Sequence, residues 1–154
     1  MRVELEGIVK QGLRHASGED IDGKKYPDAD GVVGTISKQK PFFKEVIPES
    51  SRFFNGTINL DITPNLFRIL NPDYEVTCQW KKGVTETFWF VDVDIKHNHS
   101  FSKGFVYYPG TSEIKRHTVN NMFELLAPKM PDVNYGDAIS ILYSPVKIKI
   151  YSKS

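Results

Sequence analysis

A short run in the first half of the chain combines a glycine with two oxygen-bearing side chains at alternating positions. In Gly56-Thr57-Ile58-Asn59, Thr57 and Asn59 are two residues apart, and in an extended chain such residues point to the same side. A hydroxyl and an amide oxygen together suit Mg²⁺, which prefers oxygen ligands and is commonly shared with substrate phosphates. Gly56 would let the backbone approach a phosphate. The same residues also fit a glycine turn before a strand, with local hydrogen bonds.

A carboxylate and a basic segment in the second half of the chain are further candidates for chemistry. Glu124 interrupts the apolar run 122–126, and burying a carboxylate is costly unless it is paired or reaches a cavity. Glu124 is therefore either the polar-face residue of a half-buried strand or part of a ligand site. Upstream, Lys115, Arg116 and His117 either bind phosphate or carboxylate groups or lie exposed in a turn.

Two other groups of residues have side chains that can bind metal ions, but their spacing does not favour a metal site. The acidic segment 19–30 carries carboxylates of the kind that calcium accepts, yet it matches no EF-hand loop and two lysines interrupt it. His97 and His99 alternate, but zinc requires at least a third ligand. We interpret the first group as a solvated loop and the second as an exposed turn.

Alternating apolar and polar residues predict a mostly β protein with little helix. In the clearest run, Val91, Val93 and Ile95 face one way and the charged residues between them face the other. Further strands are expected over 3–9, 58–62, 74–80, 105–108, 122–126, 138–143 and 147–151, and residues 31–36 are expected to be extended. The best helix candidate is 42–47, which Pro41 opens and Pro48 ends.

Composition narrows the class of protein. The 154 residues suit a single domain over 1–154, and a net charge of +1 argues against a protein that follows a nucleic-acid backbone by charge. A single cysteine excludes an internal disulfide. The first residues do not resemble a signal peptide, and no apolar run has the length of a membrane span. We expect a cytoplasmic protein with no membrane partner.

Three segments together resemble the archaeal CTP-dependent riboflavin kinase family. They are Gly56-Thr57-Ile58-Asn59, Glu124-Leu125-Leu126-Ala127-Pro128 and Tyr135-Gly136-Asp137, in this order. The resemblance implies a compact six-stranded cradle-loop β-barrel, a nucleoside triphosphate (CTP) and a riboflavin-like acceptor as substrates, and magnesium as cofactor. It implies that Thr57 and Asn59 hold the metal.

The resemblance also implies roles for residues outside the metal site. Glu124 would be the catalytic residue that assists the ribityl hydroxyl. Gly12 and Gly34, with Thr35, would border the phosphate loop, and Gly56 and the basic segment 115–117 would contact ligand groups. In this chain, residues 12–34 replace a short glycine-rich loop with a longer polar one, which would form a lid over the ligand. The alternative function is a non-catalytic binding module for a flavin or a nucleotide, or an interaction protein, of the same fold.

Overall fold

The computed structural model describes residues 1–11, 35–54, 56–109 and 120–152, and these residues form a mostly β protein, as predicted. The described strands are β1 (Val3–Lys10), β2 (Ile58–Asp61), β3 (Asn65–Ile69), β4 (Tyr74–Lys81), β5 (Val84–His97), β6 (Ser100–Pro109), β7 (Met122–Leu126), β8 (Ala138–Tyr143) and β9 (Ile148–Ser152). The described helices are α1 (Thr35–Phe43) and a short 3-10 helix, η1 (Pro48–Arg52).

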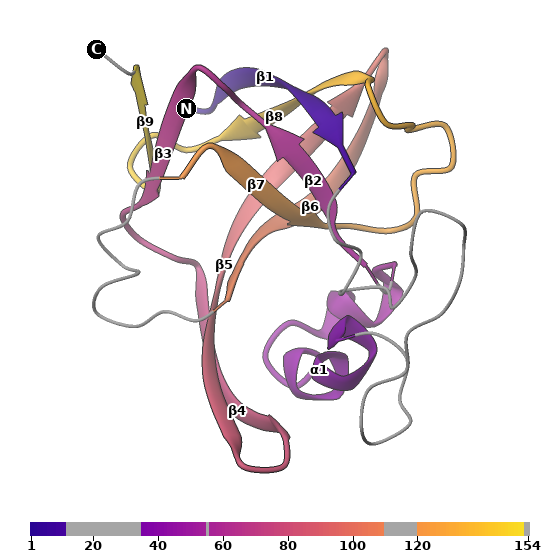
Figure 1. The fold of residues 1–154 in the computed structure, drawn as a ribbon, viewed down its shortest axis with the longest axis vertical. Helices are drawn as coiled ribbons and strands as arrows, with labels where there is room; N and C mark the ends of the chain where they lie inside the picture. The colour runs from indigo at the N-terminus through magenta and orange to yellow at the C-terminus, as the bar shows by residue number, and fades with distance from the viewer. Residues whose placement is uncertain (12–34, 55, 110–119, 153–154) are drawn as a thin grey trace.

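Six of the described strands close into a ring. The main sheet has the order β4-β5-β6-β7-β2-β1-β8, and an additional pairing joins β8 back to β5. Every pairing in it is antiparallel. The ring of β5, β6, β7, β2, β1 and β8 occupies the upper half of Figure 1. β3 and β9 form a separate two-stranded ribbon whose apolar side chains join the core of the ring.

The long strand β5 belongs to two parts of the sheet. Its first half pairs with β4, whereas residues 94–96 pair with β8. Between these pairings, the backbone N–H of Asp92 donates to Asp73 Oδ2 at 2.7 Å, and Asp73 also forms an ion pair with Lys147. The Asp73 carboxylate thus provides a hydrogen-bond acceptor to β5 in the gap between the residues that pair with β4 and those that pair with β8. Below this point β4 and β5 project from the ring as a hairpin (Figure 1).

Alternation along the strands fills the interior of the ring with apolar side chains. The register places Leu60 opposite Phe123 and Val91 opposite Val106, and all four are fully buried. Gly7 also faces inward, because a Cβ there would lie 2.8 Å from Leu60 Cγ. The interior is therefore a packed core, and ligands must bind to the outside or to the ends of the ring.

A second apolar cluster lies on the outer face of the sheet, beneath α1. Phe43 packs edge-on against Phe88 and Phe90, with ring centroids 5.1 Å and 4.8 Å away. Ile36 and Ile47 are buried in the same cluster. The helix segment therefore covers the outer face of β4, β5 and β6. Among the described residues, no helix is long and apolar enough to cross a membrane.

The predicted position of the helix was wrong. α1 begins at Thr35 and has Pro41 near its end, whereas Pro41 was expected in the first turn, and residues 35 and 36 are helical where an extended segment was expected. The reason is tertiary packing, since Ile36, Gln39 and Phe43 bury one side of the helix on the sheet. Pro41 lies in the last turn of α1, where it cannot donate the backbone hydrogen bond of that position, and the helix ends two residues later at Phe43.

We predict that Asp73→Ala lowers the free energy of unfolding by about 1–3 kcal/mol, because the Asp92 N–H and Lys147 both lose their partner. Asp73→Asn should lose less, since its amide oxygen still accepts from Asp92. Urea unfolding of the three proteins measures the difference. Asp132→Ala, at an exposed loop aspartate, is the control and should change stability by less than about 0.5 kcal/mol. Equal stability of the two alanine variants would contradict the role of Asp73.

Candidate functional site

The strand that begins at Ile58 and the strand that carries Glu124 are neighbours in the ring. β2 and β7 pair with Ile58 opposite Leu125 and with Asn59 opposite Glu124. Ile58 and Leu125 pack in the interior core, so Asn59 and Glu124 point to the outer face as a cross-strand pair. Both are half-buried. The structure therefore brings a predicted metal ligand and the predicted catalytic carboxylate to the same position of one ladder.

Thr57 immediately precedes β2 and is half-buried. An extended backbone at Thr57 would carry its hydroxyl to the same side as Asn59, two residues further on. The hydroxyl and the amide oxygen are neutral donors that Mg²⁺ accepts together with water and phosphate, so this donor set fits the metal. In the described parts of the chain no group of three His, Cys, Asp or Glu side chains could hold a metal ion. Gly56, beside Thr57, is buried.

Lys10 completes a row with Asn59 and Glu124. The register of β1 and β2 places Lys10 opposite Asn59, on the side away from Glu124. A cation, an amide and a carboxylate thus lie side by side on three adjacent strands, with Lys10 exposed at the end of β1. Sequence reasoning missed Lys10, because its place in the site depends on which strands are neighbours and on their register.

Asp61 adds a negative charge next to this row. Its Oδ1 accepts a hydrogen bond from the backbone N–H of Thr63 at 2.9 Å and another from the Thr63 hydroxyl. These two bonds, and to a smaller extent the charge of Lys10, hold the pKa of Asp61 below its usual value despite partial desolvation. Asp61 is therefore ionised at neutral pH, with Thr63 engaging one of its oxygens.

A buried tyrosine connects the neighbourhood of Glu124 to α1. The Tyr107 hydroxyl donates to Gln39 Oε1 at 2.6 Å, and both side chains are buried. Burial raises the pKa of Tyr107 far above its usual value, and the charges of Glu124 and Glu86 raise it further. Tyr107 consequently remains a neutral donor and holds α1 against the strand next to β7.

The two alternating histidines do not converge. His97 ends β5, where its Nε2 lies 3.6 Å from Asp137 Oδ2. The chain then turns at Asn98, which has a φ of 56°, and His99 is exposed. The turn breaks the alternation that would have aligned the histidines. The interpretation as an exposed turn is therefore confirmed for His99 and wrong for His97, which lies half-buried at the end of β5.

Several predicted site residues lie outside the described parts of the chain. Gly12, Gly34 and the acidic segment 19–30 fall within 12–34, and the basic segment 115–117 falls within 110–119. The proposed lid belongs to the first of these ranges. Thr35 is the first residue of α1.

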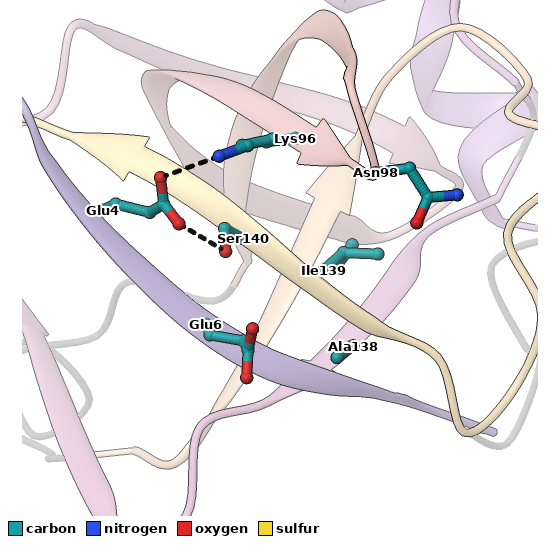
Figure 2. A pocket seen from close by; sticks show the side chains of 7 residues that line it. All are labelled: Glu4, Glu6, Lys96, Asn98, Ala138, Ile139 and Ser140. Carbon is teal, nitrogen blue, oxygen red and sulfur yellow. Dashed lines mark hydrogen bonds and ion pairs between the residues drawn. The ribbon is translucent and has the colours of Figure 1, made fainter.

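A polar hollow on the wall of the ring lies apart from the Lys10–Asn59–Glu124 row. Its volume is about 250 Å³, and its lining comes from β1, β8 and the end of β5: Glu4, Glu6, Lys96, Asn98, Ala138, Ile139 and Ser140 (Figure 2). Glu4 accepts hydrogen bonds from Lys96 Nζ at 3.5 Å and from Ser140 Oγ at 3.2 Å. The Glu4 carboxylate is therefore hydrogen-bonded to neighbouring residues of the hollow. The hollow lies on strands other than β2 and β7.

Two comparisons with known proteins identify no family for this chain. A scan against protein-family models found no match, and a search of curated proteins found none either. The proposed function therefore rests on the three segments that carry the family resemblance and on the geometry of the site.

We predict that Tyr107→Phe lowers the free energy of unfolding at neutral pH by about 1–3 kcal/mol, because Gln39 Oε1 is left buried without its donor. The deficit should shrink above about pH 10, where tyrosine ionises in the unfolded chain. The wild type then loses stability as the pH rises toward the raised folded-state pKa of Tyr107, whereas phenylalanine does not titrate. Urea unfolding at pH 7 and at pH 10.5 or above measures both effects. A constant difference across this range would contradict the neutral, buried hydroxyl.

Proposed function

We propose that this protein is a riboflavin kinase-like phosphotransferase with a cradle-loop barrel. It would transfer the terminal phosphoryl group of a nucleoside triphosphate, CTP by resemblance, to a hydroxyl of riboflavin or a related small molecule. The observation that carries the proposal is the pairing of Asn59 with Glu124 across β2 and β7. Two segments that resemble the same family, far apart in the sequence, meet on one face of the ring.

Each residue of this face has a role that follows from its chemistry. Glu124 accepts a hydrogen bond from the acceptor hydroxyl and draws its proton away as the new O–P bond forms. The bond between the transferred phosphorus and the nucleoside diphosphate breaks in the same step, which yields FMN when riboflavin is the acceptor. The half-buried setting of Glu124 limits its contact with water and keeps the carboxylate directed at the acceptor.

Thr57 and Asn59 are the residues that would hold magnesium. When bound, the metal neutralises part of the phosphate charge and helps to orient the phosphoryl group. By resemblance, Gly56 contacts ligand groups through its backbone. By resemblance, Gly12, Gly34 and Thr35 border the phosphates, and the basic segment 115–117 contacts further anionic groups.

The test is to incubate the protein with riboflavin, Mg²⁺ and each of the four ribonucleoside triphosphates, and to follow FMN by chromatography. We expect turnover with at least one nucleotide. Thr57→Val, Asn59→Leu and Glu124→Gln should each lower kcat/KM on the order of 10²-fold, as when one preorganised charge-stabilising group is removed. Thr85→Val, on the exposed part of β5, is the matched control for Thr57→Val and should leave turnover unchanged.

Two results would contradict parts of the proposal. Binding of flavin or nucleotide without FMN formation would show a non-catalytic binding module of the same fold. No binding of either ligand by calorimetry would refute the assignment of substrates altogether. Unfolding curves of all variants must match the wild type, so that a loss of turnover reports on the site.

A further inference from the structure

Lys10 has the geometry of a ligand-binding residue but no role in the family resemblance. Its Cα is the direct partner of the Asn59 Cα across β1 and β2, and Asn59 is in turn the partner of Glu124. Adjacent strands lie about 4.8 Å apart, so the Lys10 Cα is roughly 5 Å from that of Asn59 and 10 Å from that of Glu124. A lysine side chain is long enough to reach over Asn59, its neighbour on β2.

Among Lys10, Thr57, Asn59, Asp61 and Glu124, only Lys10 carries a positive charge. The predicted metal ligands Thr57 and Asn59 are neutral, while Asp61 and Glu124 carry carboxylates on the same face. A nucleoside triphosphate remains negative after it binds one magnesium ion, so this face would repel it without a protein cation. Lys10 supplies that cation from a strand, which fixes its backbone position.

Lys10 is also available for a ligand. It is exposed, and it forms no ion pair within the described residues. Its charge contributes to the lowered pKa of Asp61, but the two hydrogen bonds from Thr63 contribute more. An exposed lysine whose strand position is next to Asn59 is suited to binding phosphate oxygens.

We infer that Lys10 binds the polyphosphate of the nucleoside triphosphate, beside Thr57 and Asn59, the residues that would hold magnesium. This inference rests on the proposed function. Lys10, at the end of β1, supplies the positive charge that the neutral side chains of Thr57 and Asn59 do not provide. Lys10 therefore determines the affinity for the nucleotide, while the affinity for the flavin depends on other residues.

The experiment measures binding of CTP, or of whichever nucleotide supports turnover, with Mg²⁺ and without riboflavin by titration calorimetry. Lys10→Met should weaken nucleotide binding at least about tenfold, as expected for the loss of one charge-assisted contact. Lys10→Arg should recover most of the affinity. Because the contact is exposed, the difference between wild type and Lys10→Met should narrow as salt is raised. In turnover assays the KM for nucleotide should rise while the KM for riboflavin stays constant.

The matched control is Lys103→Met, which removes another exposed lysine from the outer face, on β6 opposite Asp94. It should bind the nucleotide like the wild type. Equal affinities of Lys10→Met and Lys103→Met would overturn the inference while leaving the proposed function intact. A wild-type protein that binds no nucleoside triphosphate would overturn both. Lys10→Gln provides a second neutral variant if Lys10→Met alters the unfolding curve.

Discussion

The whole arrangement depends on how β5 exchanges one neighbouring strand for another. A strand inside a sheet must satisfy its backbone groups on both edges. β6 pairs with one edge of β5, and the other edge pairs with β4 along the first half and with β8 near the end. At the change of partner the Asp73 carboxylate accepts the N–H of Asp92, with Lys147 balancing its charge. This local substitution allows β8 to approach β5. Closure of the ring, and with it the position of β1 beside β2, follows from that approach.

The polar row on the outside of the ring is held in place by the apolar residues inside. A shift of one residue between β2 and β7 would turn Asn59 inward and Leu60 outward. Leu60 is fully buried opposite Phe123, and burying one such side chain contributes about 1.5–3 kcal/mol. The hydrophobic core therefore fixes which polar groups are neighbours on the outer face. No direct contact between Lys10, Asn59 and Glu124 is required for this.

The sequence predicted those features that depend on short-range patterns. Alternation over 91–96 identified β5, and short apolar runs identified β7 and β8. The ribbon strand β3 was not predicted, because its apolar pair Leu66 and Phe67 is short and lies between the polar residues Asn65 and Arg68. The start of α1 was missed because packing on the sheet, rather than local propensity, determines it. Lys10 could not be assigned to the site, since two long-range strand pairings bring it there.

The two apolar clusters lie on opposite faces of the same sheet, and this separation affects which part of the protein can unfold by itself. Phe43 fits against Phe88 and Phe90 on the outside, whereas the interior of the ring is filled without any residue of α1. Detachment of the helix would therefore expose aromatic rings but leave the ring of strands closed. Such a molecule has two units of subglobal unfolding. Amide hydrogens of α1 would then exchange with solvent through fluctuations that leave the amides of β2 and β7 protected.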